Sequence, residues 1–300
     1  MRRSLISFGL ASLIVLIWPA TALAATTDPL LGTSGFYAVL ASATITNTGP
    51  SWITGQMALS PSTATSITGF PPGVSGHQDS GPAGAALNAR NDAEAAYSRA
   101  AAEPGCSTTG VELGSRTLGP GLYCNPTMGI SAGLTLTLNG GGIYIFQIGS
   151  TLITGASARV LLTNGAQPCD IFWQVGSSAT IGGSTAFVGT ILASASITMV
   201  TAATLNGRAL AALGTNAPSQ GAVTLDTNRI IQPSGCGSFT TSYPTPAYVA
   251  PPAGNILPAT LGVPWELINE IPWLLVIAVG AGFGATVLVV SNRRRRRNSA

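Results

Sequence analysis

The stretches "IFQIGSTLITGASARV" (residues 145–160) and "IFWQVGSSATIGGSTAFV" (171–188) align with each other, and this repetition decides the fold. Looser copies follow at 190–207 and 221–231. The alignment puts three apolar residues in equivalent places, namely Ile153, Ile181 and Val200. The units are unequal but of solenoid size, and one unit cannot bury its apolar side alone. Stacked units can bury it, so we predict a parallel β-helix whose coils pair through parallel hydrogen bonds.

The composition supports a mainly β protein with one exception. The chain has 37 glycines and only 8% charged residues, and it is rich in Ala, Ser, Thr, Val and Ile, which suits strands joined by tight turns. Residues 81–105 are instead rich in alanine and end at Pro104-Gly105. We therefore expect one long α-helix over about 82–102, packed alongside the β-body.

Both ends of the chain carry patterns of an exported, membrane-anchored protein. Arg2 and Arg3 precede an apolar run and the small-x-small site "TALAA", which is typical of a signal peptide cleaved after Ala24. An uncharged apolar stretch followed by Arg293 to Arg297 predicts one membrane span with a basic cytoplasmic tail. The expected organisation is a signal peptide 1–24, a folded domain 25–233, a Pro-rich linker 234–270, a transmembrane helix 271–290 and a tail 291–300.

The linker contains "LPATLG" (257–262), which is similar to the Leu-Pro-x-Thr-Gly signal that sortases cleave. Leu261 stands where that signal has glycine. Plain retention in the membrane is therefore favoured over covalent attachment to a cell wall, and both alternatives stay open.

Charge and cysteine content exclude some function classes. Between the leader and the tail, six arginines stand against ten carboxylates, so the exported part is mildly acidic and lacks the basic face that nucleic acid requires. The four cysteines fit an oxidising compartment with up to two disulfides, and Cys106–Cys124 is the favoured pair; the others are Cys169 and Cys236. No Cys/His grouping predicts a metal site, and the single histidine, His77, sits in a Gly/Ser/Pro loop.

Several blocks together resemble the microbial ice-binding proteins with a discontinuous β-helix. They are "LGTSGFYAVLASATITNTGPSWITGQMALSP", the alanine-rich helix, "LGPGLYC", "NGAQPCDIFWQVGSSATIG" and "GAVTLDTN", in this order across about residues 29–232. The resemblance implies a right-handed, roughly triangular β-helix with a helix along one face, and adsorption to ice. It implies no cofactor and no catalytic residue, so the protein is expected not to be an enzyme.

The ice-facing strands of that family frequently carry Thr-(Ala/Gly)-x-(Thr/Asn). Three stretches can be compared with it: 154–157, 182–185 and 201–204, of which only the last matches throughout. The expected ice-binding residues are Thr154, Ser157, Ser184, Thr185, Thr201, Thr204 and Thr227. Strict strand alternation sends Thr201 and Thr204 to opposite sides, so either a corner or bulge falls inside the stretch or only one hydroxyl faces outward. Which face of the β-helix carries the site is left open.

Three other readings compete with ice binding. Threonine is a common strand residue, so its frequency can reflect β-propensity alone. A surface adhesin or structural protein on the same fold is the main alternative, and exposed aromatic residues on the outer faces would indicate it. A polysaccharide-active enzyme would need clustered carboxylates, whereas Glu112, Asp170 and Asp226 are widely separated. The expected partners are ice and, through the C-terminal span, the membrane, with a monomeric ectodomain.

Overall fold

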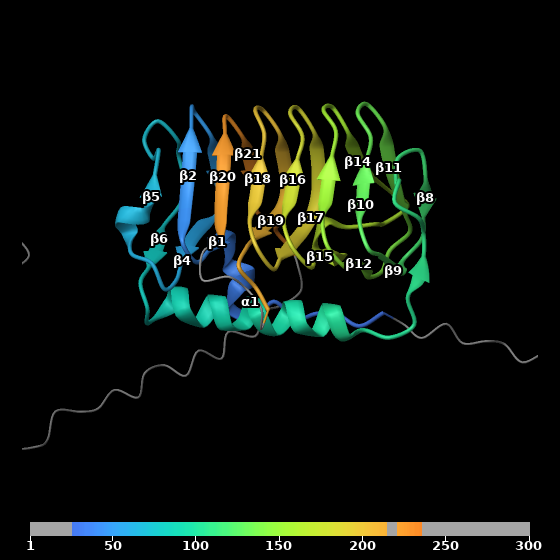
Figure 1. The fold of residues 1–300 in the computed structure, drawn as a ribbon, viewed down its shortest axis with the longest axis horizontal. Helices are drawn as coiled ribbons and strands as arrows, with labels where there is room; N and C mark the ends of the chain where they lie inside the picture. Colours follow the sequence, from blue (N-terminus) through green and yellow to red (C-terminus); the bar gives the residue numbers. More distant parts are fainter. Residues whose placement is uncertain (1–25, 215–220, 236–300) are drawn as a thin grey trace, which may run out of the picture. The chain divides into compact units, whose positions relative to one another are not determined.

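The structure is a computed structural model that describes residues 26–214 and 221–235. Its strands stack into coils, and one α-helix, α1 (Ala85–Ala102), runs along the stack (Figure 1). Every strand pair is parallel. Short 3₁₀ turns lie at η1 (Gly32–Phe36), η2 (Ala64–Ser66) and η3 (Pro168–Asp170). The predicted β-helix with one helix alongside is confirmed, and the predicted helix differs only by starting at Ala85.

A seven-stranded sheet forms one side of the coil stack. Its strands lie next to one another in Figure 1, in the order β10 (Met128–Ile130), β13 (Leu152–Thr154), β16 (Ala179–Ile181), β18 (Ile197–Met199), β20 (Ala222–Asp226), β2 (Thr44–Thr48) and β5 (Ile67–Thr68). We call its outward side the threonine face.

A second, 14-stranded sheet wraps around the other two sides. The side under α1, called the helix face, contains β6 (Gln78–Ser80), β4 (Gln56–Leu59), β1 (Tyr37–Ala41), β15 (Ile171–Val175), β12 (Tyr144–Ile148), β9 (Gly121–Asn125) and β7 (Ser107–Thr108). The remaining side, called the arginine face, contains β8 (Thr117–Leu118), β11 (Thr135–Asn139), β14 (Arg159–Thr163), β21 (Arg229–Ile231) and β3 (Trp52–Thr54). The long strands β17 (Ala186–Ala193) and β19 (Thr204–Leu210) belong to both sides.

The bend between these two sides requires glycine. Gly189 of β17 and Gly207 of β19 are in register, between the pairings made on the arginine face and those made on the helix face. A Cβ atom on Gly207 would lie 1.9 Å from the carbonyl oxygen of Gly189. Only a residue without a side chain lets the two backbones stack this closely.

The chain does not wind through the stack in sequence order. It forms β1 to β6 at one end, returns along the body through α1, and then builds coils back toward its starting point. The final strands dock on the first ones, β20 on β2 and β21 on β3. The helix therefore links the two ends of the stack, and the N-terminal strands extend a sheet that the C-terminal coils begin.

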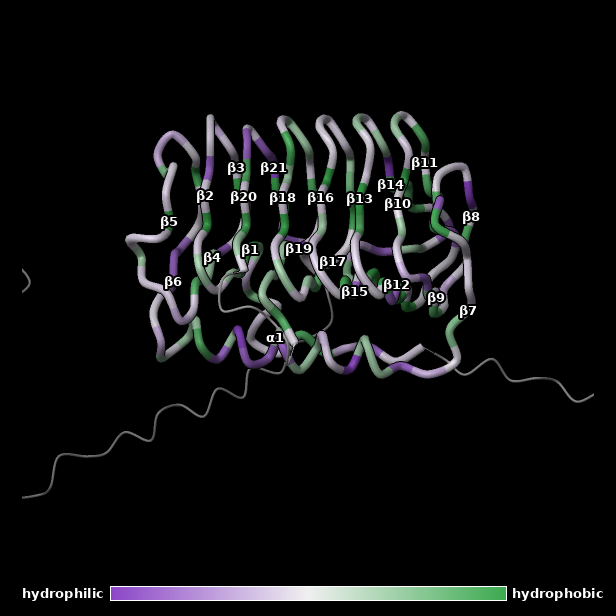
Figure 2. The backbone as a smooth tube through the Cα atoms, in the orientation of Figure 1, coloured by the Kyte–Doolittle hydropathy of each residue, from purple (hydrophilic) through white to green (hydrophobic). Residues whose placement is uncertain are grey.

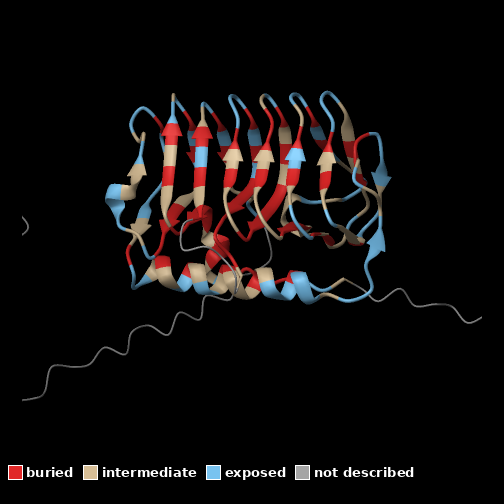
Figure 3. Cartoon of the chain, in the orientation of Figure 1, coloured by how far each residue is buried: buried red, intermediate tan, exposed pale blue. Residues whose placement is uncertain are grey.

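The interior is apolar and includes a continuous aromatic stack. The rings of Tyr123, Phe146, Trp173 and Phe187 follow one another at centroid distances of 5.4, 4.0 and 4.8 Å. The Trp173 indole nitrogen donates to the Val188 carbonyl at 2.9 Å, which satisfies its buried N–H. Figure 3 shows the buried strand positions, and Figure 2 shows the hydropathy along the backbone. Phe146, Trp173 and Phe187 are buried, and Tyr123 is partly buried against the same core.

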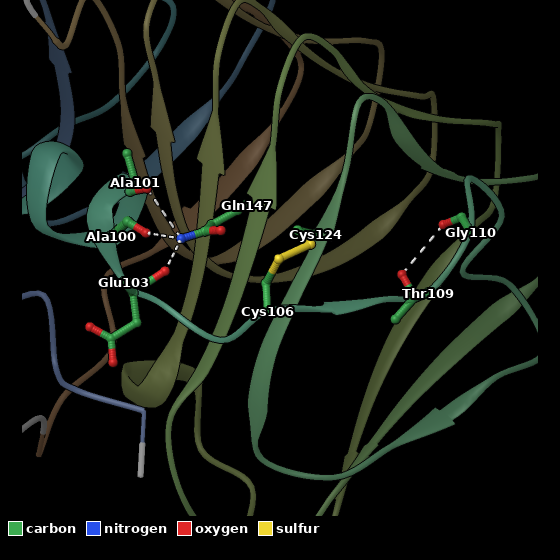
Figure 4. Close-up of a disulfide and its surroundings, with 8 residues drawn as sticks. All are labelled: Ala100, Ala101, Glu103, Cys106, Thr109, Gly110, Cys124 and Gln147. Atoms are coloured by element: carbon green, nitrogen blue, oxygen red, sulfur yellow. Dashed lines mark hydrogen bonds between the residues drawn. A yellow bond between two sulfur atoms is a disulfide. The ribbon is translucent and has the colours of Figure 1, made fainter. Parts of the chain in front are cut away.

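Helix α1 packs closely because its buried positions are all alanine. Five alanines spaced three or four residues apart form its inner stripe: Ala86, Ala89, Ala93, Ala96 and Ala100. They contact large side chains of the helix face, including Ile145, Phe172 and Leu192. Gln147 holds the helix end, because its side-chain amide donates to the carbonyl oxygens of Ala100 at 2.9 Å and Glu103 at 2.8 Å (Figure 4).

A disulfide fixes the chain just after this helix. Cys106 and Cys124 are bonded, as predicted, with an S–S distance of 2.03 Å and a Cα–Cα distance of 5.6 Å (Figure 4). Cys169 is also disulfide-bonded, and Cys236 lies outside the described residues. The predicted signal peptide, membrane span and tail, and nearly all of the predicted linker, also lie outside them. Among the described residues, no helix is both long and apolar enough to cross a membrane.

Enlarging a buried alanine of α1 should destabilise the fold. We expect Ala93→Leu to lower the free energy of unfolding by about 1–3 kcal/mol, because the helix cannot approach the sheet without strain. The matched control is Ala101→Leu at an exposed position of the same helix. This substitution should change the free energy of unfolding by less than about 0.5 kcal/mol. Urea unfolding followed by circular dichroism measures both, and equal effects would contradict this packing.

Candidate functional site

The threonine face carries one row of outward residues that are paired in register across all seven strands. The pairings Gly129↔Ile153, Ile153↔Thr180, Thr180↔Thr198, Thr198↔Thr224, Thr224↔Thr46 and Thr46↔Thr68 are continuous. Five consecutive strands of this row therefore present threonine, and we call these residues the threonine ladder: Thr180, Thr198, Thr224, Thr46 and Thr68. Neighbouring members are separated by the strand spacing, about 4.8 Å.

The ladder forms because each of its threonines follows an inward-facing residue. Thr180 lies between Ala179 and Ile181, Thr198 between Ile197 and Met199, and Thr224 between Val223 and Leu225, all six flanking residues being buried. Strand alternation then turns the threonine outward. The parallel register superimposes these outward positions from coil to coil.

Small polar residues extend this surface on one side of the ladder. Two positions earlier in each strand segment, the outward or partly exposed residues are Thr127, Thr151, Ser178, Ser196, Ala222, Thr44 and Ser66. Their short side chains leave the ladder accessible. The surface is therefore built mainly from hydroxyl and methyl groups.

Most ladder hydroxyls have no protein partner. Within the described residues, the side chains of Thr68, Thr180 and Thr198 make no hydrogen bond. Thr46 Oγ1 donates to Thr224 Oγ1 at 3.4 Å. Hydroxyl groups in this state bind water, and each can both donate and accept.

The threonine face is also almost free of charge. Asp226 is the one acidic residue in its seven strands, and they contain no basic residue. Both oxygens of Asp226 are occupied, since Thr201 Oγ1 donates to Oδ2 and Thr227 Oγ1 donates to Oδ1 at 3.1 Å. The five ladder residues are themselves uncharged, and Asp226, whose charge remains, is held by two neighbouring hydroxyls.

The sequence-predicted site residues do not share this face. Thr154 and Thr185 are buried, at 3% and 0% exposure, so their expected place on an outer surface is wrong. Thr154 Oγ1 accepts from the Gly182 N–H at 2.9 Å, and Thr185 Oγ1 donates to the Gly155 carbonyl at 2.9 Å. These hydroxyls fasten one coil to the next from inside.

A corner of the coil holds four of the other predicted residues. Ser157, Ser184 and Thr227 have φ angles of 57°, 55° and 53°, and Thr201 directly precedes Ala202, whose φ is 61°. Stacked backbone hydrogen bonds connect this corner from coil to coil, such as Ser157 N to Gly183 O at 2.8 Å. Of the two alternatives for Thr201 and Thr204, the structure shows the corner, since the chain turns at Ala202 and both threonines are exposed. A role in ice binding for these corner residues stays a prediction.

Thr204 lies on the arginine face and not on the threonine face. It pairs with Ala186, which in turn pairs with Arg159. The sequence alignment had placed Ile153 opposite Ile181, whereas the structure pairs Ile153 with Thr180. Because the side-chain period of a strand is two, this slip of one residue exchanges inward and outward positions. It explains why the alignment does not find the ladder threonines, although an apolar residue, threonine and another apolar residue recur at Thr180, Thr198 and Thr224.

The carboxylates considered for catalysis lie in different elements: Glu112 forms an isolated bridge with Gly129, and Asp226 is the last residue of β20. Glu112 Oε1 accepts from the backbone N–H of Ser131 at 3.2 Å and that of Gly114, while Asp226 is bound as described above. Asp170 ends the turn η3. Among the described residues, no group of three or more His, Cys, Asp or Glu side chains could hold a metal ion.

A family model described as "Ice-binding-like" matches residues 39–231, from within β1 to the end of β21. The chain belongs to the ice-binding-like family. An ice-binding protein of Nostoc sp. (strain HG1) is 42% identical over 209 residues, covering 67% of this chain and 73% of that protein. An ice-binding protein of Flavobacterium frigoris (strain PS1) is 33% identical over 217 residues, covering 68% and 76% of the two chains.

Solved structures of ice-binding proteins share this fold. One from an Antarctic biological consortium has a TM-score of 0.63 and 40% identity, covering 69% of this chain and 92% of its own. Another, from an Arctic yeast, has a TM-score of 0.61 and 28% identity, covering 69% and 96%.

The inward position of Thr185 can be tested through stability. We expect Thr185→Val to lower the free energy of unfolding by about 1–3 kcal/mol, because it removes a buried hydroxyl that donates to the partly buried Gly155 carbonyl. The matched control is Thr198→Val on the threonine face, where no protein hydrogen bond is lost and a change below about 0.5 kcal/mol is expected. Chemical denaturation measures both variants, and an unchanged Thr185→Val protein would contradict the inward assignment.

Proposed function

We propose that the protein binds ice through the threonine face. The observation that carries the proposal is the threonine ladder, five outward threonines in unbroken register on neighbouring strands. The names of its relatives, which are ice-binding proteins from bacteria and fungi, support the same conclusion.

The chemistry of the ladder suits ice for three reasons. The strand spacing of about 4.8 Å repeats hydroxyl and methyl groups at a distance close to the repeat of water molecules in ice. Hydroxyls without a protein partner can take part in an ordered water layer, whereas charged groups would hold water in orientations that do not fit the lattice. The methyl groups add apolar area that gains from contact with an ordered surface.

The scaffold holds the ladder rigid enough for this purpose. Parallel backbone pairing, buried Thr154 and Thr185, and the aromatic stack all connect consecutive coils. A group that is already fixed loses little conformational freedom on binding. Adsorbed molecules then stop the growth of the ice front between them.

We further propose that this binder works at the cell surface without catalysing a reaction. The leader-like N-terminus, the apolar stretch 271–290 and the arginine tail support export and anchoring by one membrane span. The carboxylates Glu112, Asp170 and Asp226 lie in different elements and two of them are bound by protein donors, which supports a binding role over the polysaccharide-active enzyme considered above. In that place the protein would restrain ice growth next to the cell or hold the cell on ice.

The face assignment is tested with one bulky residue on each of two faces. Thr198→Tyr in the centre of the ladder should lose most of the thermal hysteresis and ice shaping, because the ring holds the neighbouring threonines away from the lattice. The matched control is Thr204→Tyr, the same substitution at an exposed strand position of the arginine face, which should keep the wild-type hysteresis. If Thr204→Tyr lost the thermal hysteresis while Thr198→Tyr kept it, the ice-binding site would lie on the arginine face instead.

A further inference from the structure

The arginine face has a character opposite to that of the threonine face. Its strands lie behind those of the seven-stranded sheet in Figure 1. One outward row crosses them in register through Arg159↔Ala186, Ala186↔Thr204, Thr204↔Arg229 and Arg229↔Trp52, and a bridge pairs Trp52 with Val74. A tryptophan and two arginines therefore stand on one line along the axis of the β-helix.

Both arginines of this row lack a partner. The described residues contain six arginines, and the other four are occupied. Arg90 pairs with Glu94, Arg99 and Arg116 donate to backbone carbonyls, and Arg208 is buried. Arg159 and Arg229 are exposed and make no hydrogen bond or ion pair within the described residues.

The face is basic although the described body is acidic. The described residues hold eight carboxylates against six arginines, yet none of the strands of the arginine face contains Asp or Glu. Two unpaired guanidinium groups on a neutral background attract an anion that carries several carboxylate or sulfate groups, which arginine binds in a bidentate manner.

The exposed indole ring of Trp52 indicates that the ligand also contains a sugar ring. Trp52 is 57% exposed, so its indole ring is not used for core packing, and it pairs with Arg229 at the strand spacing of about 4.8 Å. An exposed indole offers a broad apolar surface and an N–H donor, which fits the C–H face and hydroxyls of a sugar ring. The short side chains of Ala186 and Thr204 lie between the two arginines, which are three strands or about 14 Å apart.

We infer that the arginine face binds an acidic polysaccharide, laid along the row with acid groups on Arg159 and Arg229 and a sugar ring on Trp52. Two arginines are too few for a nucleic acid, which needs a clustered basic surface. This activity is separate from ice binding, because it uses the opposite outward row of the same rigid stack. A protein with both faces could hold ice on one side and a surrounding acidic glycan on the other.

The experiment measures binding of the full-length chain to polygalacturonate and to its fully methyl-esterified form, which is the same sugar chain without charge. We expect binding to polygalacturonate only, weakened by salt. Arg229→Gln and Trp52→Ala should each weaken the affinity for polygalacturonate by about tenfold. The double variant Arg159→Gln/Arg229→Gln should weaken it more than Arg229→Gln alone. The matched control, Arg99→Gln on α1, removes the same charge elsewhere and should leave the affinity within about twofold.

Thermal hysteresis of the same variants separates the two activities. Arg229→Gln should keep it, and Thr198→Tyr should keep polygalacturonate binding, so either function can fail alone. Equal binding to both polymers, no binding at all, or an equal loss in Arg99→Gln would overturn the inference. Vesicles of phosphatidylserine and phosphatidylcholine form a further arm, and arginine-dependent binding to these vesicles without binding to polygalacturonate would also overturn it.

Discussion

Parallel stacking of the coils in fixed register is the constraint on which the rest of this molecule depends. Because each strand pairs residue for residue with the next, one outward position per coil becomes a straight row with a repeat of about 4.8 Å. The same pairing superimposes the inner positions, where aromatic rings stack and the hydroxyls of Thr154 and Thr185 join adjacent coils. A row on the surface and a column in the core are two consequences of a single geometry.

The chain path adds a second constraint, which is that the ladder is assembled from both ends of the sequence. Thr46 and Thr68 come from the N-terminal strands, while Thr180, Thr198 and Thr224 come from the late coils. Helix α1 makes this possible, since it carries the chain from one end of the stack to the other and packs closely through alanine. The face is complete only when β20 pairs with β2, so closing the discontinuous β-helix also completes the site.

Much of the fold follows from the sequence, and the site follows only in part. The repeats predict the β-helix, and the alanine-rich segment predicts its helix. The Cys106–Cys124 disulfide is also predicted, and it joins residues only 18 positions apart. All these signals are local in the sequence. The ladder depends on register, and a slip of one residue at Ile153 reverses which side chains face outward. The family motif matches residues 154–157 in part, but there the chain turns a corner and the Thr154 side chain is buried. The pairing of Thr46 with Thr224 joins residues 178 positions apart, and no local pattern predicts it.

Frozen-solution solid-state NMR on threonine-labelled protein tests the central claim most directly, by measuring magnetisation transfer from ice protons to each threonine methyl group. The account predicts strong transfer to Thr46, Thr180, Thr198 and Thr224, and little to Thr137 and Thr204 on the arginine face. Stronger transfer to the arginine-face threonines than to the ladder, or equal transfer to both, would contradict it.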